Sequence, residues 1–560
     1  MKKILFGVVL GVFQLTNAQE NAPSPVRVYG GFESNGQWYT NDKGLRINSP
    51  EDPLRSNNYL FVNTGYKNWT AGVQVEAYED QALLNYNPKY KNTNLATYFV
   101  QFKGKKVDVT GGYFYDQFGS GLLYRSWEDR ALGINNALCG ARIIFKPTDF
   151  ISFKSIAGRQ RTGFGLSKGF IAGGDLDFKL TDFFSFKTSD LSVGLTFVLR
   201  NEPIENIADP VFSPLVNASG VRVNFSHNSF YSSAEFNLKS DDAVVQVNQL
   251  RPKFVKPGSA LLVNLGYSKK GFGIDGSFRR MENMGFFSER LANGNIFNDR
   301  IVNFIPSLTK QHHSNLANIY PYQAQPNVFI NFENGKGIGK AGEIGGQIDL
   351  FYNFKKGTAL GGKYGTKLAV NFSNWNALSG NFYAPLFDYE TDFFAFGKRY
   401  FSDINVDFIK KWSPTWQSEL TWIHQYYDKN LIVNINSGTE IIQTQIVAAE
   451  STHRFGKDQS VRWVAEHMWA NADKKNWASA TLEYNLNSKW SLYTTDLYNY
   501  GNSDRLQRNH YYNAGAAFRH KTTRIAMSYG RQRGGLICVG GVCREVPESS
   551  GVSLSLNTSF

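Results

Sequence analysis

The C-terminal residues Gly551–Phe560, GVSLSLNTSF, give the strongest indication of how this chain folds. Apolar residues and Thr558 alternate in it with small polar residues, so that one side of an extended chain is apolar and the other is polar. This period of two predicts a β-strand that ends on an aromatic residue. The alternating residues are Val552, Leu554, Leu556, Thr558 and Phe560 on one side and Ser553, Ser555, Asn557 and Ser559 on the other.

The first residues are typical of a secretory signal peptide. Lys2 and Lys3 precede a short apolar run, and Thr16-Asn17-Ala18 is a small-residue cleavage site, so we expect residues 1–18 to be removed on export. No stretch of the chain reaches the roughly 18 apolar residues that a membrane helix needs. A membrane-embedded mature chain would therefore be a β-barrel, the other structure that pairs every backbone polar group in lipid.

Alternating segments recur along the rest of the chain, with clear examples at 191–199, 261–267, 344–352 and 404–408. Short turns such as Lys67-Asn68 alternate with longer connections, as in outer-membrane barrels. We predict an all-β fold in which residues 19–560 form a single large antiparallel transmembrane β-barrel. Its expected size is roughly 24 strands, within about 20–26, with both termini periplasmic and long outer loops.

The C-terminal stretch is similar to the closing strand of a bacterial outer-membrane barrel, which the barrel assembly machinery reads during biogenesis. The expected location is therefore the Gram-negative outer membrane, with a multi-pass barrel. The net charge of +13 is better explained by anionic lipid headgroups than by nucleic acid, because no nucleic-acid module is visible. Aromatic residues near strand ends predict girdles at the two lipid interfaces: Trp412, Trp416, Trp422, Tyr426, Trp463, Trp469, Trp477 and Trp490.

Residues 111–142 are rich in glycine and paired charge. YDQFGSG (115–121) is followed by Arg125, Glu128, Asp129 and Arg130. Folded into the lumen, these ion pairs would form a constriction that sets the pore size; otherwise the segment is a solvated outer loop. Both interpretations stay open. Glu128 and Asp129 are adjacent and would point to opposite sides of a strand, which argues against a hydrolase site.

Residues 283–340 are the longest interruption of the alternation. Loops of this length are usually functional or disordered, and the apolar and aromatic content here argues against disorder. We predict a long loop or plug inserted into the barrel, or a cap that binds a partner, because wide barrels are typically plugged. His312 and His313 are adjacent rather than spaced as metal ligands, so we expect a surface pair and no metal site.

Two segments also carry a family resemblance. GYFYDQFGSGLLYRSWEDRALGINNAL (112–138) and NFIPSLTKQHHSNLANIYPYQAQPN (303–327) resemble recurrent segments of a large Bacteroidota-type outer-membrane β-barrel family of unknown function. The resemblance implies a porin-like architecture and an outer-membrane location. It implies no activity and no catalytic residue.

Charged and polar residues at alternate strand positions are expected to face the lumen, because each would cost about a few kcal/mol against lipid. Their signs are mixed, so they predict no solute selectivity, and they suggest no cofactor. The predicted lumen-lining residues are Asp275, Arg279, Glu343, Gln347, Asp349, Asp403, Asp407 and Glu419.

Cys538 and Cys543 bracket Gly540-Gly541, a two-residue hairpin signal that places the cysteines opposite each other. Their Cα atoms would be about 4.5 Å apart, within disulfide range. In an exported protein we therefore predict a disulfide, with Cys139 free. We expect this hairpin to project beyond the membrane.

Two functions fit these patterns. One is a porin-like or gated channel for a polar solute. The alternative is a plugged barrel that acts as a scaffold or accessory subunit of an outer-membrane assembly, export or surface-lipoprotein complex. An enzyme is not expected, because the eight histidines form no Ser/His/Asp or His/Asp constellation. Expected partners are outer-membrane lipids, the assembly machinery and other outer-membrane or surface proteins, without nucleic acid.

Overall fold

The computed structural model describes residues 26–79, 81–203, 212–246, 249–292, 297–333, 336–383, 388–433, 440–539 and 542–560. The predicted signal peptide, residues 1–18, lies outside them. In the part of the chain that is described, no helix combines the length and the apolar character needed to cross a bilayer.

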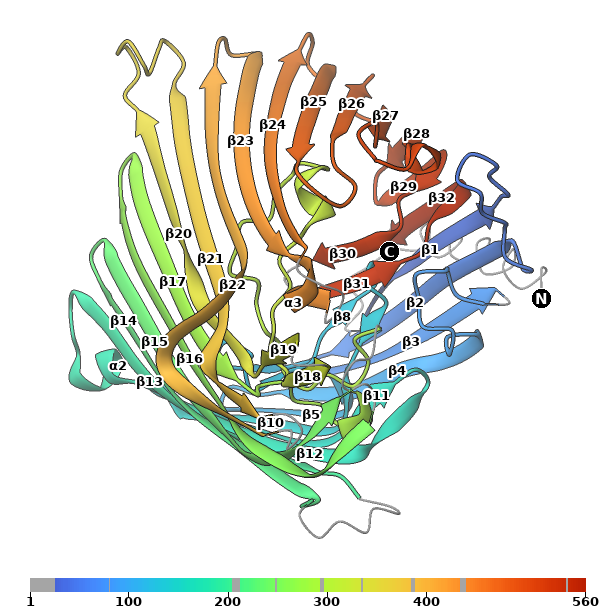
Figure 1. Ribbon diagram of the computed structural model, residues 1–560. Coiled ribbons are helices and arrows are strands. Elements are labelled where there is room, and N and C mark those ends of the chain that lie inside the picture. Colours follow the sequence, from blue (N-terminus) through green and yellow to red (C-terminus); the bar gives the residue numbers. More distant parts are fainter. Residues whose placement is uncertain are drawn as a thin grey trace.

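Twenty-four antiparallel strands form one closed sheet (Figure 1). The barrel closes where β1 pairs with β32, from Gly31 opposite Ser559 to Tyr39 opposite Gly551. The predicted all-β barrel of roughly 24 strands is therefore confirmed, and the C-terminal stretch is its closing strand. The wall strands are β1 (Val26–Tyr39), β2 (Leu54–Tyr66), β3 (Trp69–Glu79), β4 (Asn92–Lys103), β5 (Val107–Phe114), β10 (Leu138–Thr148), β11 (Ile151–Thr162), β12 (Gly165–Lys179), β13 (Ser189–Asn201), β14 (Leu215–His227), β15 (Phe230–Gln246), β16 (Gln249–Lys269), β17 (Phe272–Glu282), β20 (Gly342–Phe354), β21 (Thr366–Tyr383), β22 (Asp388–Lys411), β23 (Trp416–Asp428), β24 (Ile441–Arg454), β25 (Ser460–Ala470), β26 (Trp477–Asn485), β27 (Trp490–Tyr498), β28 (His510–His520), β29 (Thr523–Gln532) and β32 (Ser549–Ser559).

The connections at one end of the barrel are short, and we call this end the tight-turn rim. The start of β1 and the end of β32 lie at the same end, because β2 leads from the partner of Val26 directly into the first short turn. The opposite loop end carries longer connections, including 40–53, 115–137, 283–341 and 533–548. The tight-turn rim consists of residues 67–68, 104–106, 149–150, 180–188, 228–229, 270–271, 355–365, 412–415, 455–459, 486–489 and 521–522.

Successive side chains along the wall strands point alternately to the outer and the inner side of the barrel, as the sequence pattern predicts. In β13, Leu195 and Phe197 are exposed on the outer side, whereas Thr196 and Val198 are buried inside. Of the predicted girdle residues, the six tryptophans other than Trp477 are exposed. Trp477 is a wrong assignment, because it is buried and stacks on Tyr511 inside the barrel. Tyr426 is covered by the Arg399 guanidinium, 3.9 Å from its ring centre.

Smaller elements lie outside the wall sheet. Several of them, including β18, β19, α3, β30 and β31, lie within the ring of strands in Figure 1, so the lumen holds folded chain. These elements are β6 (Gln117–Phe118), β7 (Tyr124–Arg125), β8 (Glu128–Asp129), β9 (Ile134–Asn135), β18 (Phe329–Glu333), β19 (Lys336–Lys340), β30 (Gly535–Val539), β31 (Val542–Val546), α2 (Leu180–Phe184), α3 (Lys429–Val433), and the 3-10 turns η1 (Arg290–Ala292), η2 (Ala317–Ile319) and η3 (Arg505–Gln507).

Candidate functional site: the occupied lumen

The described residues of the connection between β17 and β20 (residues 283–341) fill much of the lumen, and we call this connection the plug. Its apolar side chains join wall side chains in three buried clusters, so apolar packing covers much of the inner wall toward the loop end. Leu308 and Ala324 contact both of the two largest clusters and link them across the lumen. The buried plug residues with larger apolar side chains are Met284, Phe286, Val302, Leu316, Ile319, Tyr320, Tyr322, Val328, Ile330 and Ile338.

A fully buried ion pair fastens the plug to the wall. Arg279 of β17 and Glu343 of β20 meet at 2.6 Å with no exposed side-chain surface. The Tyr322 hydroxyl and the Gln325 backbone N–H of the plug donate to the Glu343 carboxylate at 2.7 and 2.8 Å, and the Tyr400 hydroxyl also donates to it. Arg279 in turn donates to the carbonyl of Pro306. Charges this deeply buried require such partners, because their desolvation is unfavourable.

Two further wall carboxylate groups hold the middle of the plug. Glu466 of β25 accepts hydrogen bonds from the Ser314 hydroxyl at 2.6 Å and from the Leu316 backbone N–H at 3.1 Å. The expectation of a surface histidine pair is wrong for His312, whose Nε2 lies 2.9 Å from Asp403 Oδ2 with both side chains buried. The plug therefore meets the wall through specific polar contacts as well as through apolar packing.

The eight predicted lumen-lining residues all lie on the inner side of the wall. Arg279, Glu343 and Asp403 contact the plug, as does Asp407, which pairs with Lys310. Asp349 accepts from Asn371 at 2.6 Å and lies opposite Asp275 in the register of β17 and β20. Gln347 shares the inner face of β20 with Glu343 and Asp349, and Glu419 of β23 lies opposite Ile409, two positions beyond Asp407 on β22. Half of the set therefore faces folded chain rather than an open pore.

Residues 115–137 also fold into the lumen, beside the plug. Arg130 pairs with Glu33 of β1 at 2.9 Å and with Glu128 at 3.2 Å. The Arg125 guanidinium lies 4.0 Å from the ring centre of Phe304 in the plug. Asp129 accepts from the backbone N–H of Leu132 at 2.9 Å. The segment is therefore folded inward, and its ion pairs brace it against the wall and the plug. Its role as a constriction that sets the pore size stays a prediction.

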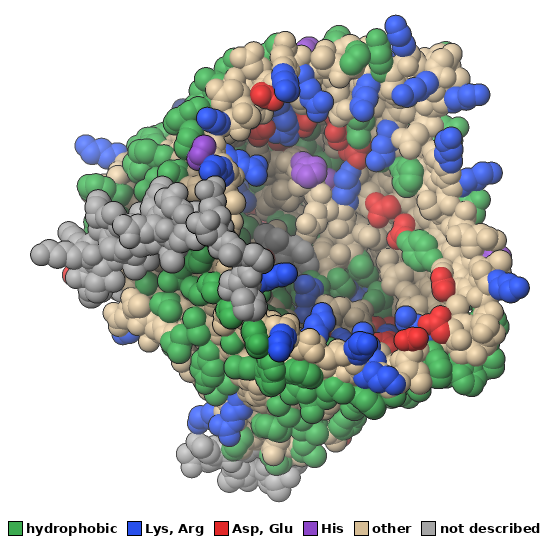
Figure 2. Space-filling view, turned by 180° about the vertical axis from the view of Figure 1, so that it is seen from behind, with side chains coloured by type: hydrophobic (Ala, Val, Ile, Leu, Met, Phe, Trp, Pro, Cys, Tyr) green, Lys and Arg blue, Asp and Glu red, His purple; other side chains and the backbone are tan. Residues whose placement is uncertain are grey.

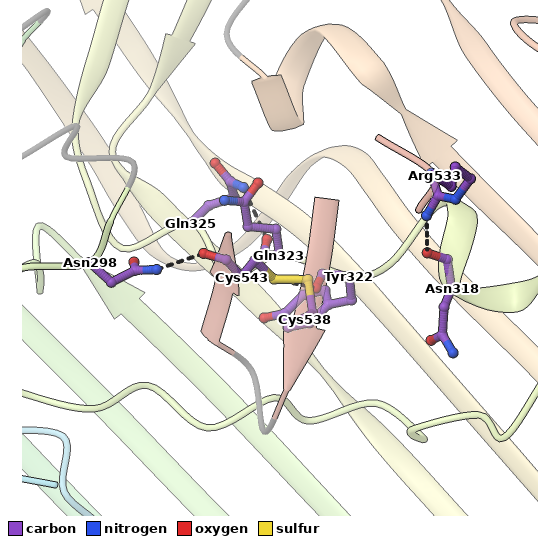
Figure 3. The surroundings of a disulfide bond; sticks show 8 residues. All are labelled: Asn298, Asn318, Tyr322, Gln323, Gln325, Arg533, Cys538 and Cys543. Carbon is purple, nitrogen blue, oxygen red and sulfur yellow. Dashed lines mark hydrogen bonds between the residues drawn. A yellow bond between two sulfur atoms is a disulfide. The ribbon is translucent and has the colours of Figure 1, made fainter. Parts of the chain in front are cut away.

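The hairpin of β30 and β31 carries a disulfide between Cys538 and Cys543, whose Cα atoms are 4.0 Å apart. Cys139 is a free thiol. The expectation that this hairpin projects outward is wrong, because Figure 3 shows it against the plug. Asn298 donates to the carbonyl of Cys543 at 2.7 Å, and Cys543 Sγ lies 3.7 Å from the carbonyl oxygen of Tyr322. The hairpin buries apolar side chains by folding back, which a projecting hairpin would leave in water.

Breaking this disulfide is expected to loosen the hairpin from the plug. The closed loop is short, so the chain-entropy model gives about 2 kcal/mol of stabilisation. The double variant C538S/C543S should therefore be cut faster than the wild type within residues 533–548 in limited proteolysis. Cys139→Ser is the control and should leave the rate unchanged. Equal rates for the double variant and the wild type would contradict this role.

Lys340 of β19 is buried in the plug and donates to Gln325 Oε1 and to the carbonyl of Leu431. Burial lowers the pKa of Lys340 to about 7, against the opposing charges of Glu343 and Asp428. The pKa of a lysine in the unfolded chain is about 10.4. Below about pH 7 the folded protein therefore carries the full free-energy cost of burying the charged Lys340 ammonium group. This cost is lifted as the pH rises from about 7 to about 10.4.

The plug is therefore expected to be held more firmly at pH 9 than at pH 6. Amide hydrogen exchange of residues 338–345, corrected for its intrinsic pH dependence, should show greater protection at pH 9. Lys340→Met keeps the length of the side chain and should abolish the difference, whereas Lys475→Met, an exposed control, should retain it. An unchanged pH dependence in Lys340→Met would refute the assignment to this lysine.

Several cavities remain around the inserted segments, and Figure 2 shows a deep hollow with Lys and Arg side chains around its edge. A cavity of about 400 Å³ lies between Gln117–Ser120 and the wall, lined by charged groups that include Lys154, Asp177, Arg222 and Glu235. A second cavity of about 650 Å³ lies among the plug, α3 and the disulfide hairpin.

Within the described residues, no group of three His, Cys, Asp or Glu side chains is placed to hold a metal ion.

Sequence reasoning missed the wall residues that pack on the plug, among them Trp375, Tyr400 and Glu466. Trp375 is fully buried, donates from its indole to the carbonyl of Leu308 at 3.2 Å, and lies 5.2 Å from the Tyr322 ring. One signal was available. Val198 interrupts the polar side of β13, and it is buried in the cluster around the plug.

These features define a class of protein: a closed 24-stranded β-barrel whose lumen is filled by its own connections. The chain belongs to the family of unknown function DUF6029, whose model matches residues 1–560. No curated protein sequence matches it.

Solved structures with a similar architecture include the translocation pore of the P pilus usher PapC, with 9% identity, coverage of 96% of this chain and 99% of that chain, and a TM-score of 0.42. The siderophore receptor PirA from Pseudomonas aeruginosa has 9% identity, coverage of 96% and 81%, and a TM-score of 0.39. OccK3 (OpdO) from Pseudomonas aeruginosa has 8% identity, coverage of 95% and 95%, and a TM-score of 0.34. The likeness concerns the barrel architecture alone.

Proposed function

We propose that this protein is an integral β-barrel of the outer membrane that its own loops keep closed. In this proposal it serves as a scaffold or accessory subunit of an outer-membrane complex and not as an open porin or an enzyme. The tight-turn rim then faces the periplasm and the long connections face outward, as in other barrels. Exposed apolar side chains on the outer side of the wall, such as Leu195, Leu265 and Leu554, support contact with lipid.

The observation that carries the proposal is the depth at which the plug is buried. Ten larger apolar side chains of the plug lie in buried clusters, and each contributes about 1.5–3 kcal/mol on burial. Even if only half of that burial were lost on opening, the sum would be on the order of 10 kcal/mol. A free-energy difference of that size between the closed and the open state leaves a negligible open population at rest.

Single-channel recording in a planar bilayer tests this proposal. The intact protein should show no steady current, whereas a variant in which a short Gly-Ser linker replaces residues 285–339 should conduct steadily. Steady conductance of the intact protein would overturn the closed-barrel proposal on its own, whether or not the deletion variant folds. If the intact protein carries no current, the partners that copurify with it would identify the complex to which it belongs.

A gated channel is the second candidate, and the 400 Å³ cavity favours it. That cavity is lined by Asp175, Asp177, Arg222 and Glu235, which give it charged walls on the tight-turn side of residues 115–137. A polar solute could occupy it if a partner displaced the plug. Solute flux that appears only when a copurified partner is added would support this second candidate.

A further inference from the structure

The two ends of the barrel differ in charge. Counting the short connections and the strand residue next to each, the tight-turn rim has only three acidic residues, Asp149, Asp182 and Asp458. At the loop end the signs are close to balance. The excess of basic over acidic residues at the tight-turn rim, sixteen against three, equals the net charge of the whole chain, +13. The rim has sixteen basic residues, all exposed: Lys67, Lys103, Lys105, Lys106, Lys179, Lys187, Lys269, Lys270, Lys355, Lys356, Lys363, Lys411, Arg454, Lys457, Lys489 and Lys521.

These basic side chains have almost no acidic partner within the described part of the protein. Among the described residues, Lys179 is the one member of the set with an acidic group within 4 Å, Asp182 at 3.9 Å, and both side chains are exposed. Like charges around one rim repel each other within a Debye length, about 8 Å at physiological ionic strength. An anionic surface that follows the rim would remove this repulsion.

Aromatic pairs mark the same turns on the outer side of the wall. Trp69 and Phe102 have ring centres 5.0 Å apart, and Trp412 and Trp416 stack at 5.4 Å. Trp490 and Phe518 form another pair at 4.8 Å. Aromatic rings of this kind settle at the boundary between acyl chains and headgroups. The rim lysines next to them therefore lie at the depth of the lipid phosphates.

We propose that the tight-turn rim binds the phosphate groups of anionic phospholipids in the leaflet that surrounds it. The basic residues occur on most of the turns around the circumference, which matches a ring of lipids better than a single patch for a soluble protein. Lysine near an anionic leaflet is attracted to it at short range. This inference rests on the proposed membrane location and adds a lipid preference to it.

Brominated lipids test the preference directly. Bromine quenches tryptophan fluorescence on contact, and Trp69, Trp412, Trp416, Trp463 and Trp490 are exposed near this rim. In mixed bilayers at low ionic strength, brominated phosphatidylglycerol should bind the wild type about fivefold or more tightly than brominated phosphatidylcholine. The variant with Lys67, Lys105, Lys270, Lys356 and Lys521 changed to Gln should lose most of this preference, and so should the wild type in high salt.

The matched control changes five basic residues at the loop end, Lys43, Lys89, Lys91, Lys475 and Arg505, to Gln, and its preference should equal that of the wild type. Resistance of the inserted barrel to trypsin in both lipids reports membrane insertion separately. Failure to insert would count against the proposed function, whereas insertion without lipid preference would overturn only this inference. A preference that falls equally in both variants would also overturn it. In either case, an acidic soluble protein would remain as the candidate partner of the basic rim.

Discussion

Replacing Glu343 with alanine is expected to release the plug from the wall. The change leaves the guanidinium of Arg279 buried without its carboxylate, and it removes the acceptor for Tyr322, Gln325 and Tyr400. Breaking a buried ion pair by removing one partner costs about 3–5 kcal/mol. Chymotrypsin should therefore cut within residues 285–339 much faster in Glu343→Ala than in the wild type.

Gln347→Ala is the matched control for this prediction. Gln347 lies four residues further along β20 on the same inner side, so its replacement tests the strand without touching the ion pair. Its cleavage rate should stay close to that of the wild type. If Glu343→Ala were as resistant as Gln347→Ala, the ion pair would not hold the plug.

Trp375→Ala is expected to give the second large effect, a loss of about 3–5 kcal/mol from the cavity that it leaves. Trp375 is fully buried, and its indole faces both the plug and the Arg279 guanidinium, 5.0 Å from the ring centre. On SDS gels without prior boiling, a folded barrel migrates faster than the unfolded chain. The temperature at which heating converts the faster band to the slower one should fall markedly in Trp375→Ala. Trp422→Ala, on the exposed outer side of β23, is the control and should shift this temperature far less.

The two substitutions are also expected to be non-additive, because Arg279 contacts both replaced groups. Residues that share a partner usually show interaction energies of about 0.5–3 kcal/mol in a double-mutant cycle. The double variant should therefore lose less stability than the sum of the single losses. Strict additivity would indicate that the ion pair and the indole hold the plug independently.

Much of the wall could be predicted from local pattern. The clear alternation at 191–199, 261–267, 344–352 and 404–408 falls in β13, β16, β20 and β22. An apolar outer side and a more polar inner side make the side-chain period of a strand visible over a few residues, and turn residues indicate the ends. That is why the strand number could be predicted without any long-range information.

The interior was harder to predict, because an apolar residue that faces a packed plug looks the same in the sequence as one that faces lipid. Trp422 and Ile423 are consecutive and apolar, yet the first is exposed outside and the second is buried against the plug. The same ambiguity explains why the prediction that places Trp477 at the lipid interface is wrong. Charged positions such as Glu343 and Asp403 could be assigned inward, but their partners in the plug could not.

The barrel, its approximate strand number and the inward direction of its charged side chains therefore follow from the local amino-acid pattern, since these depend on the side-chain period of a strand and on the cost of exposing charge on its apolar side. The contents of the lumen, in contrast, are known only from the three-dimensional packing. Residues 115–137, 283–341 and 533–548 meet there from distant parts of the chain. Their burial depends on contacts between segments, which no local periodicity records.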